Sequence, residues 1–121
     1  PYVNSVVYEG AGIATFNNNV VDLYSIVLNA DDRIYFEVVI DTTNATDNTM
    51  THKFCGHAHR PLVGNVVLDK VITNFAHKTD LTWLTPTIAA DTANNAIDFR
   101  VNPESRQQHQ TITVKYKRWE Y

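Results

Sequence analysis

The sequence predicts an all-β protein, an antiparallel β-sandwich of jelly-roll type with about eight or nine short strands. Runs rich in β-branched and aromatic residues, each about as long as a short strand, are separated by clusters of Asn, Asp, Gly and Pro. Several runs alternate apolar and polar residues, which places the two kinds on opposite faces of a strand. No segment combines helical periodicity with capping signals. With 121 residues and neither repeat nor linker, we expect residues 1–121 to form a single domain.

The first third of the chain contains four runs that favour strands. Gly10-Ala11-Gly12, Asn17-Asn18-Asn19 and Asn29-Ala30-Asp31-Asp32 are the turn signals between them. The expected strands are Val3–Tyr8, Ile13–Phe16, Val20–Leu28 and Arg33–Ile40.

The strand Arg33–Ile40 is apolar on both faces. Ile34, Phe36, Val38 and Ile40 share one face, and Tyr35, Glu37 and Val39 share the other. Such a strand is central in a sandwich, or another subunit covers its outer face. Tyr35, Glu37 and Val39 are therefore predicted interface residues.

The middle of the chain predicts three further strands. Met50–His59 ends at Arg60-Pro61, Leu62–Ile72 carries Gly64 as an expected bulge, and Leu81–Leu84 surrounds Trp83, an expected core residue. Asp41–Asn48 and Asn74–Asp80 are expected connectors. The first of them has oxygen donors suited to calcium, but a polar loop needs no ion, and it lacks the glycine and final glutamate of an EF-hand.

The last third reads as a closing hairpin. In Asn95–Val101, Ile97, Phe99 and Val101 alternate with Asp98 and Arg100, which could pair on the solvent face. Pro103–His109 is the polar connector, and in Thr111–Lys117 residues Ile112, Val114 and Tyr116 are expected to point inward.

The alternation breaks at Arg118. Trp119 and Tyr121 fall on the phase that Thr113 and Lys115 keep polar. We expect a bulge near Lys117–Arg118, or a strand end that leaves the sheet. Trp119 and Tyr121 are therefore predicted interface residues that bury against another surface.

The densest set of potential metal ligands is Cys55-Gly56-His57-Ala58-His59. Residues 55, 57 and 59 share one face of a strand, and His52 lies on the other. His57 and His59 are candidate ligands for zinc or iron. They could bind the ion within one chain, or three copies of the chain could share one ion on a three-fold axis. The alternative is a polar strand face with a partly buried cysteine. Because Cys55 is the single cysteine, an internal disulfide is excluded.

Composition limits the classes of function. The net charge of −3 disfavours nucleic-acid binding, and the basic residues near the end of the chain (Arg106, Lys115, Lys117, Arg118) read as a solvated strand face. No apolar run is long enough for a bilayer, and the opening Pro1-Tyr2-Val3-Asn4 is not a signal peptide. No catalytic motif is present, so we expect no enzyme, and no cofactor is predicted.

The aromatic content suggests a binding surface. Six tyrosines, five phenylalanines and two tryptophans exceed what the core needs. Tyr2 and Tyr24 are candidate ligand-binding residues, because surface aromatics on a β-sandwich serve protein interfaces or sugar stacking.

The C-terminal half resembles a β-sandwich module of bacteriophage virion proteins, found in tail-fibre tips and small virion structural proteins. The resemblance lies in Thr79-Asp80-Leu81-Thr82-Trp83, in the turn and alternating strand from Ala89 to Val101, and in Thr111-Ile112-Thr113-Val114. The chain departs from that pattern in its long charged connector Pro103–Gln110 and in Val114, where an aromatic residue is common.

The resemblance implies a non-enzymatic virion component, commonly a homotrimer, displayed on the virion surface after synthesis in the host cytoplasm. Without a fibre shaft, the expected role is a small capsid decoration (cement) protein that contacts the major capsid protein or another virion protein. The alternative is a tail-fibre tip or receptor-binding module that recognises a host surface glycan. Neither role involves nucleic acid or a membrane.

Overall fold

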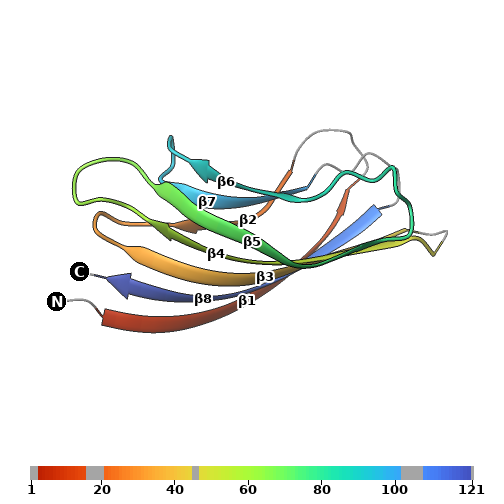
Figure 1. Cartoon of the computed structure of the whole chain (residues 1–121), viewed down its shortest axis with the longest axis horizontal. Helices are drawn as coiled ribbons and strands as arrows, with labels where there is room; N and C mark the ends of the chain where they lie inside the picture. Colours follow the sequence, from red (N-terminus) through yellow and green to blue (C-terminus); the bar gives the residue numbers. More distant parts are fainter. Residues whose placement is uncertain (1–2, 16–20, 45–46, 102–107, 121) are drawn as a thin grey trace.

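The computed structural model describes residues 3–15, 21–44, 47–101 and 108–120, with the backbone alone for 3–15 and 108. Over these ranges the chain forms eight antiparallel strands in two packed sheets, which confirms the β-sandwich (Figure 1). The strands are β1 (Val3–Thr15), β2 (Val21–Val27), β3 (Arg33–Thr43), β4 (Thr49–His59), β5 (Val67–Lys78), β6 (Thr87–Asp91), β7 (Ala96–Val101) and β8 (Gln108–Glu120). Several are longer than the expected short strands. No helix in the described ranges could span a membrane.

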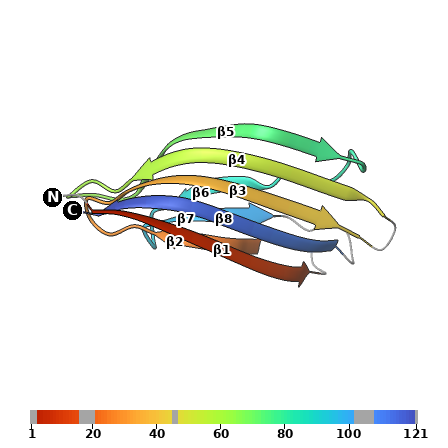
Figure 2. The same cartoon turned by 90° about the horizontal axis from the view of Figure 1, so that it is seen from below.

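The larger sheet has five strands in the order β1-β8-β3-β4-β5. Strand β3 is central: Tyr35 pairs with His57 of β4 on one side and with Lys117 of β8 on the other. Figure 2 shows this sheet in front of the smaller one. The edge strand β5 pairs with β4 and carries two register shifts, at Asp69 and at Asn74.

The smaller sheet has the order β2-β7-β6. The outer strands of the chain are nested as in a jelly roll, because β1 pairs with β8 and β2 pairs with β7 in the facing sheet. Strands β3, β4 and β5 depart from that pattern, since they form a meander within the larger sheet.

The core lies between the inner faces of the two sheets. The inward residues predicted for β3, β7 and β8 are all buried, and the rings of Phe36 and Phe99 meet edge-to-face with centroids 5.2 Å apart. Trp83 is buried as expected. The outward-facing Asp98 is also buried, and it pairs with Arg100 at 2.8 Å rather than on an open solvent face.

The predicted closing hairpin is wrong. Strand β7 pairs with β2 and β6, whereas β8 pairs with β1 and β3 in the other sheet. Alternation determines which side chains of a strand face the core, and both arms do face it. It does not determine the pairing partner, because two facing sheets offer the same apolar environment.

Three element boundaries also differ from expectation. Gly10-Ala11-Gly12 is no turn, because it pairs along Thr111–Thr113 of β8 inside the continuous strand β1. Strand β5 begins at Val67 and runs to Lys78, so Gly64, with a φ of 132°, lies in the preceding turn. Residues 81–84 form no strand, because Asp80 accepts hydrogen bonds from the Thr82 amide at 3.0 Å and hydroxyl at 2.6 Å and closes a turn.

The break in the alternation of apolar and polar residues at Arg118 does not come from the predicted bulge. The pairing of β8 with β1 and β3 continues without a shift through Trp119. Arg118 simply occupies an inward position, where it forms an ion pair with Asp32. Trp119 therefore faces outward and is half-buried, while Tyr121 lies outside the described residues.

Candidate functional site

Most of the predicted site residues lie on the outer face of the five-stranded sheet. Tyr35, Glu37 and Val39 project from β3. Trp119 of the neighbouring strand β8 pairs with Arg33, the first residue of β3. Cys55, His57 and His59 project from β4 onto this face. In the described part of the chain no strand lies over this face (Figure 2).

Two predicted ligand residues are not on this face. Tyr24 belongs to β2 of the smaller sheet, where its half-buried ring packs against the core and stacks on Phe99 at 6.5 Å between centroids. Packing is the role that this contact supports. Tyr2 lies outside the described residues.

A shallow hollow of about 150 Å³ lies around Tyr35, and Glu37, Lys115 and Lys117 contribute to its lining. The Tyr35 hydroxyl donates to Glu37 at 3.2 Å, and the Lys115 ammonium lies 3.7 Å from the same carboxylate. Burial, together with the hydrogen bond to Glu37, raises the pKa of Tyr35. Enclosed small-molecule pockets are larger, about 300–1,000 Å³, so this hollow suits a group presented by a partner surface.

The two histidines of β4 share one carboxylate. The Nδ1 atoms of His57 and His59 each lie 2.8 Å from the same oxygen, Oδ2 of Asp69. Burial raises the pKa of Asp69, but the hydrogen bonds from His59 and His57 outweigh it and bring the pKa below its usual value. Asp69 was not predicted as a site residue, and its β-bulge gives no clear signal in the sequence.

Cys55 is held apart from the histidines. Its Sγ atom lies 3.7 Å from Oδ1 of Asn74, the residue at the second bulge of β5. A nucleophilic cysteine needs a hydrogen bond to its base, and this thiol contacts the amide oxygen of Asn74 and the side chain of Tyr35. Its position supports the partly buried cysteine that the alternative interpretation assumed.

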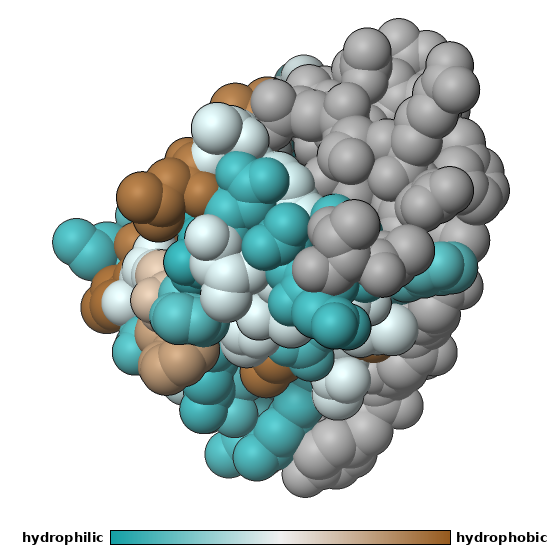
Figure 3. All heavy atoms as spheres, turned by 90° about the vertical axis from the view of Figure 1, so that its right-hand side faces the viewer, coloured by the Kyte–Doolittle hydropathy of each residue, from teal (hydrophilic) through white to brown (hydrophobic). Residues whose placement is uncertain are grey.

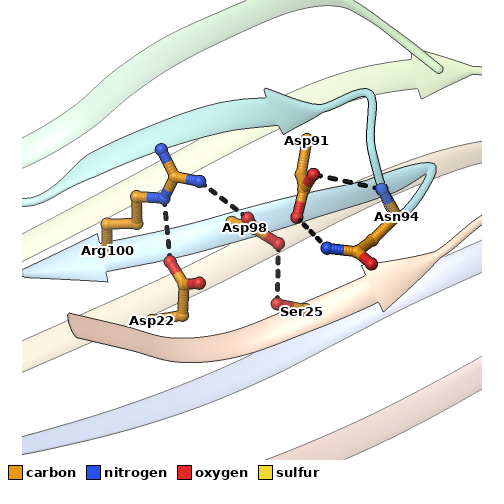
Figure 4. A network of polar contacts seen from close by, with 6 residues as sticks. All are labelled: Asp22, Ser25, Asp91, Asn94, Asp98 and Arg100. Atoms are coloured by element: carbon orange, nitrogen blue, oxygen red, sulfur yellow. Dashed lines mark hydrogen bonds and ion pairs between the residues drawn. The ribbon is translucent and has the colours of Figure 1, made fainter. Parts of the chain in front are cut away.

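A second polar cluster lies on the smaller sheet (Figure 4). Buried Asp98 accepts from Ser25 at 2.7 Å and from Arg100 at 2.8 Å, and Arg100 also binds Asp22 at 2.8 Å. These contacts tie β2 to β7, and hydrogen bonds to Asp22 and Asp98 raise the pKa of Arg100. These hydrogen bonds and ion pairs join residues of the cluster to one another, which is typical of a structural network.

The candidate calcium loop is shorter than predicted. Strand β3 continues to Thr43, and the carboxylate of Asp41 accepts a hydrogen bond from Thr51 at 2.7 Å. Among the side chains that the structure describes, no group of three or more His, Cys, Asp or Glu residues could hold a metal ion.

Comparisons with protein-family models, with curated proteins and with solved structures found no match to this chain. The outer face of the five-stranded sheet holds most of the candidate functional residues.

Proposed function

We propose that the chain is a non-enzymatic structural protein of a virion, a small capsid decoration protein that contacts its neighbours through the outer face of its five-stranded sheet. One observation carries this proposal: the predicted interface residues Tyr35, Val39 and Trp119 lie together on this face. Exposed apolar side chains of β5 extend the same face, since Ile72 is 48% exposed and Phe75 is 54% exposed.

The charge of this face supports an acidic partner. Among its described side chains, five cations (Arg33, Lys53, Lys70, Lys115, Lys117) outnumber three carboxylates (Glu37, Asp41, Asp69), whereas the chain carries −3 in total. A basic face on an acidic protein gives a preferred docking orientation and speeds association with a negatively charged surface. The apolar side chains between the charges then contribute burial.

One end of the molecule also exposes apolar groups, but it is less suited to a protein contact than the outer face of the five-stranded sheet. Figure 3 shows separate apolar patches divided by polar side chains over the described part of this end. Leu81 and Leu84 are exposed in the turn between β5 and β6. Small separate patches suit a protein–protein interface less well than a continuous sheet face.

The test is co-sedimentation with emptied tailed-phage capsids, together with the molar mass of the protein from light scattering over a dilution series. We expect a homotrimer and saturable binding that Lys115→Gln/Lys117→Gln weakens. Thr92→Glu/Ala93→Glu changes two exposed residues of the β6–β7 turn, alters the net charge by the same amount, and should bind as the wild type does. Equal binding by both variants would contradict docking through this face, and a monomer at all concentrations would contradict the trimer.

The hollow beside Tyr35 favours a second function, recognition of an acidic host glycan. Lys117 and Lys115 flank a phenol and a carboxylate there, a combination suited to a sugar that bears carboxylate or sulfate groups. A glycan array separates the two proposals. Binding to acidic glycans that is lost in Lys115→Gln/Lys117→Gln, without binding to capsids, would replace the decoration role by receptor binding.

A further inference from the structure

The five-stranded sheet has two edges, the strands β1 and β5 (Figure 2). An edge strand presents a row of backbone N–H and C=O groups that its own sheet leaves unpaired, and another chain can add a strand there. Proteins commonly block this pairing with β-bulges, short edge strands, lysine or proline. The edge strands of this sandwich differ in whether they carry such features.

Three of the four edge strands are protected. Strand β5 carries two register shifts and two lysines, Lys70 and Lys78. In the smaller sheet, β2 has a register shift next to Asp22. The other edge of that sheet, β6, is five residues long and follows Pro86 directly. Each of these features disturbs or shortens the row of backbone groups that an added strand needs.

Strand β1 is the exception. Its 13 residues, Val3–Thr15, pair one-to-one with β8 without a register shift. The sequence of this strand contains no lysine, arginine or proline, and its one charged residue is Glu9. In the described part of the chain, β8 is the one strand that pairs with it. Strand β1 is therefore the long, regular edge to which a further strand can be added.

We propose that β1 pairs with β1 of a second copy of the chain, antiparallel and about a two-fold axis. An antiparallel edge is complementary to its own copy, because each donor of one strand meets an acceptor of the other and the reverse. A pair of such 13-residue strands forms about 12 hydrogen bonds, and a typical specific interface has about 10. Pairing centred on any residue other than Glu9 keeps the two copies of Glu9 from lying directly opposite each other.

This pairing joins the two larger sheets into one continuous sheet. The two-fold axis of an antiparallel strand pair is perpendicular to the sheet, so both outer faces lie on the same side. The contact uses backbone groups of β1, whereas the docking proposed above uses side chains of the outer face, so the inference goes beyond that function and does not depend on it. In a trimer, the same edge joins one trimer to another, and a two-fold axis is added to the three-fold axis.

The experiment is disulfide cross-linking of the whole chain in a Cys55→Ser background, which removes the single cysteine. One cysteine replaces each residue of the range 4–14 in turn, and the oxidised proteins are separated on a non-reducing denaturing gel. Cysteines at the two-fold axis lie opposite each other, whereas cysteines three residues from it are about 20 Å apart along the strands and cannot form a disulfide. We expect a covalent dimer at one position or at two adjacent positions.

Lys70→Cys in the same background is the matched control. Lys70 is an exposed residue of β5, the edge strand of the same sheet that carries the register shifts, so this variant should stay monomeric on the gel. Dimer yields along β1 no higher than that of the control, or equal yields at all positions of β1, would overturn the proposal.

Hydrogen exchange of the wild-type chain is a second readout that does not depend on the folding of any variant. Alternate amides of β1 point away from β8. Pairing with a second copy should slow their exchange at least about tenfold in concentrated protein relative to dilute protein. Fast exchange of these amides at every concentration would also overturn the proposal.

Discussion

The guanidinium of Arg118 forms a largely buried ion pair with the carboxylate of Asp32, at 3.1 Å and with side-chain exposures of 14% and 3%. Arg118 also donates to the carbonyl of Val27 at 2.8 Å, and Asp32 accepts from the amide of Asn29 at 2.9 Å. The pair thus ties the end of β8 to the turn between β2 and β3. It joins the two sheets at one end of the sandwich (Figure 1).

Replacement of Arg118 by Met should lower the free energy of unfolding by about 3–5 kcal/mol, because it leaves a buried carboxylate without its counter-ion. Urea denaturation measures the loss. The double variant Asp32→Asn/Arg118→Met removes both charges and should recover part of it. Lys117→Met is the matched control on the exposed face of the same strand, where a change within about 0.5 kcal/mol is expected. A similar effect of the two single Met variants would show that the ion pair contributes nothing special.

Gly56 is required by the ring that lies across from it. Phe36 pairs with Gly56 on the neighbouring strand, and a Cβ at this position would overlap the Phe36 ring and lie 2.6 Å from the carbonyl oxygen of Lys70. Gly56→Ala should therefore cost about 1–3 kcal/mol of unfolding free energy through overpacking. Denaturant midpoints provide the measurement.

The double variant Phe36→Leu/Gly56→Ala tests that cause. Leucine removes the ring atoms nearest to the new methyl group, so the double variant should lose less than the sum of the two single variants, with a coupling of at least about 0.5 kcal/mol. Strict additivity would point to the Lys70 carbonyl as the source of the clash.

His52 should make the fold sensitive to mild acid. Its ring is buried on the inner face of β4 and its Nδ1 atom has no hydrogen-bond partner. Burial, and then the positive charge of Lys78, lower its pKa from 6.5. The unfolded chain thus binds a proton more readily than the folded chain. The stability contributed by neutral His52 is present above pH about 6.5 and is lost as the pH falls below it.

Urea midpoints between pH about 7.5 and 5 check this sign. Wild type should lose stability over this window, and His52→Leu should lose less, because it removes the buried titrating group and the unsatisfied nitrogen. His77→Ala, which removes an exposed histidine, should keep the wild-type slope. An unchanged slope in His52→Leu would assign the acid sensitivity to other groups.

The sequence by itself determined the class of fold and the faces of most strands. Alternation of apolar and polar residues identified the buried side of β3, β7 and β8, and the same period placed Cys55, His57 and His59 together on one face, opposite His52. These inferences succeed because a period of two is a local property of an extended backbone.

Only the tertiary structure decided which strands pair and which distant residues meet. The separation of β7 and β8 into different sheets, the inward position of Arg118 against Asp32, and the convergence of His57 and His59 on Asp69 all depend on contacts between segments far apart in the chain. Facing sheets offer equivalent apolar environments, so pairing is a global choice. A bulge shifts the pairing register by one residue without a strong local signal in the sequence. For this reason the sequence did not predict Asp69 as a site residue.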